Sequence, residues 1–288
     1  MAPASSRLSL SSLLAPLARP VRSPAPLVRR APGGGGTRRL APAGPRAFGP
    51  VTQPSSGPAA EGLPVTLAGT PARQRDETTC GSMVLLMLAA TGDPVLAGWL
   101  ERGTLPPDLD RLPPEIPPDA TALATTAARL EAAQQRLKNR TRSRALGPAP
   151  WPGRLGTVPW TAAREARFPG VRYRSIPMDD ASPRAEALLT SVHGATTAGA
   201  AVPLYTGGDL SGGVAAAVPR HVVLAVPPPA AAEHRGRDDA GHPALHLYDP
   251  ASARVYAVPL AHLLARREPH PALGGWTHVC WVLLPVPD

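Results

Sequence analysis

The chain has 288 residues with 43% hydrophobic residues, 39 prolines and 27 glycines, a composition that fits a globular protein with long irregular stretches. The net charge of +9 is concentrated in residues 1–60, which hold eight arginines and no Asp or Glu, so the rest of the chain carries only about +1. The folded part therefore gives no electrostatic reason to expect a nucleic acid as partner. No run approaches the ~18 apolar residues that a transmembrane helix needs.

Residues 1–62 are low-complexity, rich in Arg, Pro, Ala and Gly, and contain GGGG at 33–36. Such a segment cannot bury enough apolar surface to offset the entropy of ordering it, so we expect a disordered tail followed by one domain over 63–288. The segment 8–18 faintly resembles the apolar core of a signal peptide, but it lacks a convincing cleavage site. We therefore expect a cytoplasmic protein, with secretion as the alternative.

The domain begins with helical patterns. A continuous apolar run from Cys80 to Ala90 predicts a buried helix, with Thr78 and Thr79 as candidate N-caps and a stop at 91–94. A Pro-rich loop over 104–118 follows. A second helix is expected from Asp119, as its cap, to about Arg140, with Leu123, Ala127, Leu130 and Leu137 on its apolar face.

The later part of the chain changes its period. A short helix over 159–168, a strand over 171–176 and a helix over 183–198 precede a series of short branched runs separated by turns. These runs are typical of antiparallel strands, at 202–205, 221–226, 244–248, 254–258 and 279–286. The segment 227–243 is expected to be an exposed loop. Helices first and an antiparallel sheet second predict an α+β fold.

Only two cysteines are present, and neither has the spacing of a metal site or a Cys-x-x-Cys motif. Two free thiols are expected, with no metal and no cofactor. Cys80 stands at a helix N-terminus, where unpaired backbone N–H groups and the helix dipole favour a thiolate. The alternative is a thiol that only packs in the core. Cys280 lies within the run HVCWVLL and is interpreted as a buried structural thiol.

Two other residues could act with such a thiol. His221 opens the run HVVLAV, so it is placed at the start of a strand, where a base can meet a nucleophile from another part of the fold. The other histidines in apolar segments, His246, His262 and His278, are interpreted as packing or surface residues. Asp249 ends the strand ALHLY and opens DPAS; it could start a turn, orient the imidazole of His221, or do both.

Four segments together resemble the papain-like superfamily, and within it most closely the stand-alone relatives of the bacteriocin-leader-processing cysteine peptidases (cysteine peptidase family thirty-nine). They are QRDETTCGSMVLLM at 74–87, RHVVLAV at 220–226, LHLYDPASARVYAVPLAHL at 245–263 and WTHVCWVLLPV at 276–286. The interval of 141 residues between Cys80 and His221 is within the range of papain-type enzymes. The insertion at 227–243 departs from the compact family pattern.

The resemblance implies a papain-like fold and a cysteine peptidase that acts on a peptide or protein substrate. It implies Cys80 as the nucleophile, His221 as the base and Asp249 as the residue that orients the base. Gln74, six positions before Cys80, would donate its side-chain amide to the oxyanion. Two alternatives use the same residues: an acyltransferase of the transglutaminase kind, in which an amine resolves the thioester, and an inactive papain-like binding module.

Overall fold

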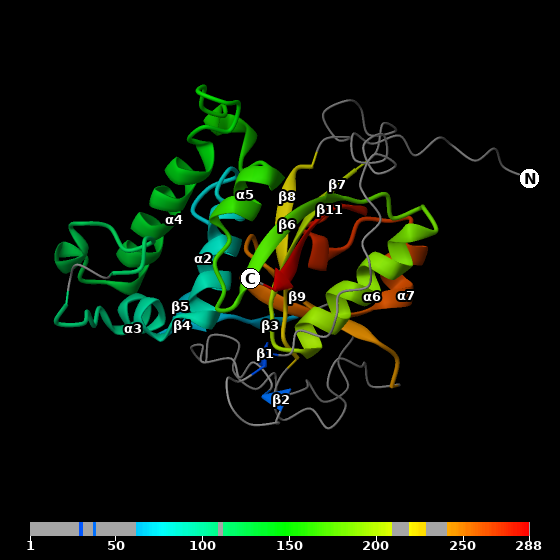
Figure 1. Cartoon of the computed structure of the whole chain (residues 1–288), viewed down its shortest axis with the longest axis horizontal. Coiled ribbons are helices and arrows are strands. Elements are labelled where there is room, and N and C mark those ends of the chain that lie inside the picture. The colour runs from blue at the N-terminus through cyan, green and yellow to red at the C-terminus, as the bar shows by residue number, and fades with distance from the viewer. Residues whose placement is uncertain are drawn as a thin grey trace, which may run out of the picture.

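A seven-stranded sheet forms the centre of the computed structural model, in the strand order β3-β10-β9-β8-β7-β11-β6 (Figure 1). The structure describes residues 29–30, 37–38, 62–108, 112–208, 219–228 and 241–287. All neighbouring strands are antiparallel, so the predicted α+β class with an antiparallel sheet is confirmed. The strands are Leu63–Pro64 (β3), Val171–Pro177 (β6), Val202–Gly207 (β7), His221–Val226 (β8), Ala244–Asp249 (β9), Arg254–Pro259 (β10) and His278–Pro287 (β11).

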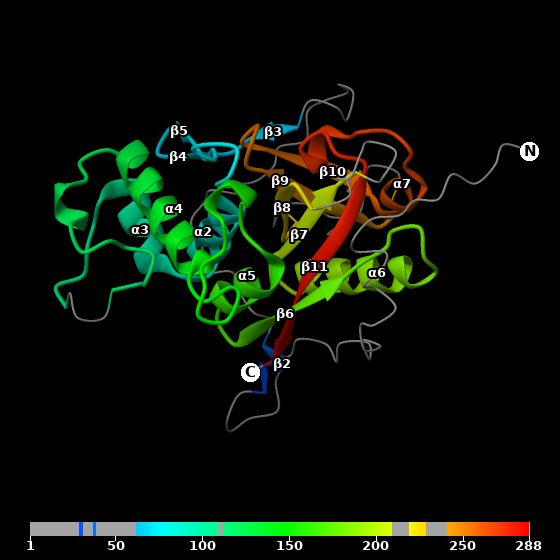
Figure 2. The same ribbon diagram turned by 90° about the horizontal axis from the view of Figure 1, so that it is seen from above.

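Helices cover both faces of this sheet. Helices α2 to α5 lie on one side and α6 and α7 on the other (Figures 1 and 2). The α-helices are Cys80–Gly92 (α2), Pro94–Arg102 (α3), Thr126–Arg142 (α4), Pro159–Glu165 (α5), Arg184–Thr197 (α6) and Leu260–Ala265 (α7). Short 3₁₀ turns are Ala120–Ala122 (η4), Gly153–Leu155 (η5) and Pro271–Leu273 (η7), and Thr66–Leu67 (β4) pairs with Thr70–Pro71 (β5).

Strand β8 shows why the central strands are apolar throughout. Val222, Leu224 and Val226 belong to the core shared with α2 to α5, whereas Val223 and Ala225 belong to the core shared with α6 and α7. Successive side chains of a strand point to opposite faces, so a sheet covered on both faces needs apolar residues at every position. This two-sided burial fixes β8 firmly in the sheet, including its first residue.

Helix α2 is apolar on all sides because neighbouring elements surround it. All of its residues from Cys80 to Thr91 are buried. Helix α2 ends at Gly92, within the predicted stop at 91–94, and a second helix, α3, starts at Pro94. Asp93 caps α3, because its Oδ1 accepts hydrogen bonds from Val95 N (2.9 Å) and Leu96 N (3.1 Å). An Asp followed by Pro at the first helical position is itself a helix start signal. Helix α3 was not predicted from the sequence, because residues 91–94 were interpreted only as the end of a helix.

The helix predicted from Asp119 divides in two. Residues 120–122 form η4, and α4 begins after Thr125, whose Oγ1 accepts a hydrogen bond from Ala128 N (3.1 Å). Ala127 is exposed and Leu123 precedes the helix, so the predicted apolar face was wrong at these two positions. The buried residues of α4 include Leu130, Ala133 and Leu137.

The order of elements along the chain is more mixed than predicted. Strand β3 precedes α2, and β6 precedes α6, so a helical part followed by a sheet describes the chain only in part. The predicted tail at 1–62 lies outside the described residues except for Gly62 and two antiparallel two-residue strands, Arg29–Arg30 (β1) and Thr37–Arg38 (β2). The segment 8–18 and most of the 227–243 loop also lie outside them.

In the part of the chain that the structure describes, no single helix has the length and apolar character to cross a membrane. Helices α2 and α3 reach that length and composition only when taken together, and they are bent by 115° at the break between them.

The first turn of α2 packs tightly against the segment before α5. A Cβ atom built on Gly81 would lie 2.7 Å from Thr157 Cβ, closer than two carbon atoms can approach. Gly194, on the exposed side of α6, has no atom within 4 Å of the same position. Both glycines are helical, so they form a matched pair.

We expect Gly194→Ala to raise the free energy of unfolding by up to about 1 kcal/mol, because alanine favours a helix more than glycine does. Gly81→Ala should lower it by about 1–3 kcal/mol, because the added methyl group displaces Thr157. Urea unfolding of both variants measures the two changes. Equal stabilisation by both substitutions would contradict the close packing at Gly81.

Candidate active site

The start of α2 is joined to the end of the sheet by the segment that precedes it. Val65 N donates a hydrogen bond to Ala253 O (2.8 Å), and Gln74 N donates to Pro250 O (2.9 Å). Both carbonyl groups belong to the turn between β9 and β10, which directly follows Asp249. Residues 65–74 therefore lie beside that turn, and the loop that follows them leads to Cys80 at the same end of the sheet.

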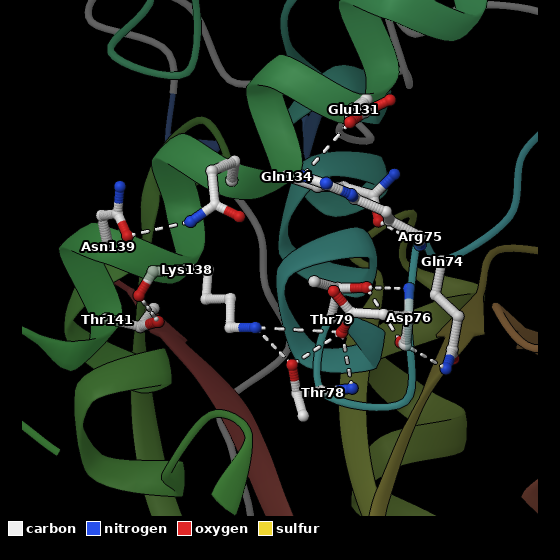
Figure 3. A network of polar contacts seen from close by, with 11 residues as sticks. Gln74, Arg75, Asp76, Thr78, Thr79, Glu131, Gln134, Lys138, Asn139 and Thr141 are labelled. Carbon is white, nitrogen blue, oxygen red and sulfur yellow. Dashed lines mark hydrogen bonds and ion pairs between the residues drawn. The ribbon is translucent and has the colours of Figure 1, made fainter. Parts of the chain in front are cut away.

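The loop before Cys80 is held by its own side chains and by α4 (Figure 3). Asp76 Oδ1 accepts hydrogen bonds from Thr78 N (2.8 Å) and Thr78 Oγ1 (2.6 Å), and Thr79 Oγ1 accepts one from Asp76 N (2.9 Å). The ammonium group of Lys138 on α4 donates to Thr78 Oγ1 and lies 3.8 Å from Asp76 Oδ1. Thr79 is the N-cap residue as predicted, but its hydroxyl bonds within the loop and makes no side-chain bond to the helix.

A second side chain of α4 holds the same loop from the other direction. Gln134 Oε1 accepts a hydrogen bond from Arg75 N (3.0 Å), while Gln134 Nε2 donates to Arg73 O (3.2 Å). Gln134 is buried, and it satisfies two backbone groups of a segment that has no regular secondary structure. The position of Cys80 is thus fixed by helix α2 on one side and by a loop anchored to α4 on the other.

Cys80 is the first residue of α2, as predicted, and its thiol is free. Only 4% of the residue is exposed. The N–H groups of the first helical turn have no partners within the helix, so negative charge is stabilised at this end.

His221 is the first residue of β8, as predicted, and pairs with Thr206 of β7. It is 7% exposed. Its Nε2 lies 2.7 Å from Asp249 Oδ1. The thiol of Cys80 also acts on the ring, since its hydrogen-bonding capacity and charge are among the causes that raise the pKa of His221. Since an imidazole has two nitrogen atoms and Nε2 is engaged with Asp249, Nδ1 is the atom that remains for Cys80.

Asp249 forms hydrogen bonds both with the turn that follows β9 and with the imidazole of His221, the two roles expected from its position in the sequence. Besides His221, its Oδ1 accepts a hydrogen bond from Ala251 N (3.1 Å), and its Oδ2 accepts from Ser252 N (2.9 Å) and Ser252 Oγ (2.7 Å). The carboxylate therefore shapes the turn after β9 and holds the imidazole. Burial alone would raise the pKa of Asp249. The hydrogen bonds from His221, Ser252 and Ala251 lower the pKa by a larger amount, so the net shift is downward.

The electrostatics of His221 follow from these neighbours. Burial lowers the pKa of its imidazole, but the hydrogen bonds and charges of Asp249 and Cys80 outweigh burial and raise the pKa to about 9. The imidazole is therefore protonated at neutral pH. A protonated imidazole between a carboxylate and a thiol is the arrangement that stabilises a thiolate nucleophile.

Gln74 lies in the loop beside this site, but the contact of its side chain is within that loop. Its Nε2 donates a hydrogen bond to Asp76 O (2.9 Å), and its Oε1 is buried without a partner among the described residues. One of the two amide hydrogen atoms is thus engaged. The role of Gln74 as an oxyanion donor remains a prediction.

Tyr205, a buried residue of β7, was not predicted from the sequence to belong to this site. Burial, and the charge of Cys80, raise the pKa of its phenol well above the ordinary value, which indicates that the ring lies near Cys80. Its hydroxyl has no hydrogen-bond partner among the described residues. No sequence signal distinguishes this tyrosine from other aromatic residues of a central strand.

A second buried His–Asp pair lies elsewhere in the sheet. His278 Nδ1 lies 3.0 Å from Asp180 Oδ1, and Asp180 Oδ2 also accepts a hydrogen bond from Val279 N (3.1 Å). This pair joins the loop after β6 to the start of β11. Cys280, two residues further on, forms no disulfide and is 1% exposed, which agrees with its predicted role as a buried structural thiol.

Over residues 62–108, 112–208, 219–228 and 241–287, no group of three or more His, Cys, Asp or Glu side chains could hold a metal ion. Comparison with known protein families finds no match, and a search of the curated proteins finds none either.

Asp249→Asn tests the origin of the raised pKa of His221. The substitution keeps the shape of the side chain and removes its charge, so the pKa should fall from about 9 towards the ordinary value of ~6.5. A protonated ring attracts the carboxylate of iodoacetate, so the rate of Cys80 alkylation by iodoacetate, relative to neutral iodoacetamide, should drop at a lower pH in the variant. Both proteins carry Cys280→Ala so that only one thiol reacts.

Asp180→Asn is the matched control, because it removes the carboxylate from the other buried His–Asp pair. It should lower stability and leave the pH at which this ratio drops unchanged. If Asp249→Asn behaves in the same way, the carboxylate of Asp249 does not govern the imidazole of His221.

Proposed function

We propose that the chain is a thiol hydrolase of the papain-like kind, a cysteine peptidase that acts on a peptide or protein substrate. One observation carries the proposal: the imidazole of His221 is hydrogen-bonded to the carboxylate of Asp249, and the thiol of Cys80 acts on the same ring and raises its pKa. Three residues from two strands and a helix meet in the order that nucleophilic catalysis by a thiol requires.

In the first step the Cys80 thiolate attacks the carbonyl carbon of the substrate, and the carbonyl π electrons move to oxygen. The backbone N–H of Cys80 at the helix N-terminus and the second N–H of the Gln74 amide are the donors proposed for this oxyanion. Losing one such donor typically costs about 3–4 kcal/mol of transition-state stabilisation. The tetrahedral intermediate collapses as His221 gives its proton to the leaving amine, which leaves a thioester on Cys80.

In the second step His221, now neutral, removes a proton from water as the water oxygen attacks the thioester. The tetrahedral intermediate then collapses: the C–S bond breaks, Cys80 leaves as a thiolate beside His221, which keeps the proton taken from water, and the acid product departs. Asp249 keeps the imidazole in one tautomer and stabilises its charged form in both steps, without itself accepting the proton.

The fold supports the papain-like assignment in outline. A buried helix carries the thiol at its N-terminus, and an antiparallel sheet presents the histidine at the start of one strand and the aspartate at the end of the next. The sequence order of nucleophile, base and orienting residue also agrees with the resemblance drawn from the motifs.

The proposal predicts that Cys80 is the reactive thiol of the folded protein. Brief treatment of the Cys280→Ala protein with iodoacetamide at neutral pH should alkylate Cys80, as seen by peptide mass mapping. His221→Ala should slow this reaction by about tenfold or more, because it removes the cation that stabilises the thiolate. Small p-nitrophenyl esters, which form the same thioester without demanding a specific peptide, should be hydrolysed, and Cys80→Ala should abolish that hydrolysis.

The outcome that opposes the proposal is a folded protein in which His221→Ala leaves the alkylation rate unchanged. Adding a primary amine to the ester reaction separates two kinds of chemistry. The free acid as product supports a hydrolase, whereas the amide as main product would assign the site to an acyltransferase instead.

A further inference from the structure

A glycine of the η7 turn lies directly against the imidazole of His221. A Cβ atom built on Gly274 would be 2.3 Å from His221 Cδ2, 2.6 Å from Nε2 and 2.9 Å from Cγ. Carbon atoms do not approach so closely, and the ring cannot move aside without giving up one of its two partners. Only a residue without a side chain fits at this position while His221 keeps its bond to Asp249.

The backbone around Gly274 is held in place by bonds from several sides. Its φ of +66° is in the left-handed region, and its N–H donates to Pro271 O (3.0 Å). The preceding carbonyl, Leu273 O, accepts a hydrogen bond from the buried Thr206 Oγ1 (3.0 Å). Thr206 is the residue of β7 that pairs with His221 in the sheet. The turn and the histidine are therefore anchored to the same rung of the β7–β8 ladder.

This arrangement encloses the imidazole. Asp249 of β9 is hydrogen-bonded to Nε2, Cys80 of α2 is the other titratable group that acts on the ring, and Gly274 lies against the side of the ring around Cδ2. Close packing beside Nε2 keeps water away from the hydrogen bond with Asp249, which strengthens that bond. It also limits the directions in which the ring can turn.

We propose that Gly274 is a positioning residue that holds the His221 ring between Asp249 and Cys80, with the Thr206–Leu273 hydrogen bond keeping the turn in place. The proposal rests on the proposed function, because it assigns Gly274 a part in the same reaction. Gly274 itself does not touch the reacting atoms of a substrate.

The neighbouring Gly275 provides a matched control. It also has a positive φ, +81°, and its N–H also donates a backbone hydrogen bond, to His270 O (3.0 Å). A Cβ atom at Gly275 would have no atom within 4 Å. Alanine at either position therefore forces a residue with a side chain into left-handed backbone, but only alanine at 274 meets the imidazole.

The test compares Gly274→Ala with Gly275→Ala in the Cys280→Ala protein. Both should lower the melting temperature, Gly274→Ala by more, because its methyl group also displaces the buried ring. Gly274→Ala should slow alkylation of Cys80 at neutral pH by about tenfold or more, since a displacement of the order of 1 Å suffices for such losses. It should also lower the pH at which the rate ratio of iodoacetate to iodoacetamide falls. Gly275→Ala should change neither.

Thr206→Val is a second route to the same turn, useful if Gly274→Ala does not fold. It keeps the size of the side chain, removes the hydrogen bond to Leu273 O and should shift the alkylation profile in the same direction. Identical alkylation profiles for Gly274→Ala, Thr206→Val and Gly275→Ala would overturn the proposal. If His221→Ala still slows alkylation in that case, only the role of Gly274 fails; if His221→Ala has no effect, the proposed function itself fails.

Discussion

The imidazole of His221 can be shared between a carboxylate and a thiol only if three separate parts of the chain end at one point. The start of β8 supplies the ring, the end of β9 supplies the carboxylate, and the start of α2 supplies the thiol. Antiparallel pairing places the first two together, because one strand begins where its neighbour ends. The thiol of Cys80 is brought to the same place by the segment 65–74, which is hydrogen-bonded to the turn after Asp249 and precedes the helix.

Burial of Cys80 and His221 strengthens the electrostatic interactions between them and Asp249. With Cys80 and His221 almost fully covered, the charges interact through a medium less polar than water, and the hydrogen bond to Asp249 and the nearby thiol of Cys80 favour the protonated ring. The same burial would penalise the imidazolium if either partner were absent. The rest of the fold supplies rigidity: apolar residues pack both faces of the sheet, and α4 holds the loop before Cys80 through Gln134 and Lys138.

Much of this was accessible from sequence because local signals and tertiary needs agree. The run CGSMVLLMLAA predicts a buried helix, HVVLAV a buried strand with His221 at its start, and Asp-Pro a turn with Asp249 at its corner. Other features depend on contacts that no local pattern encodes. The backbone of Gly274 lies against a ring more than 50 residues away in the chain, and the pairing of Asp180 with His278 joins a loop to a distant strand. Helix α3 was missed for another reason, since Asp93-Pro94 ends one helix and starts the next.

An NMR titration of the His221 ring shows directly whether Cys80 and His221 form one electrostatic pair. The ring signal is assigned with His221→Ala and followed over pH in the Cys280→Ala protein, with and without Cys80→Ala. We expect a pKa of about 9 with the thiol present and a lower pKa once the thiol is removed, because the thiol favours the protonated ring. An unchanged titration in the two proteins, or the ordinary value of ~6.5 in both, would contradict the pairing.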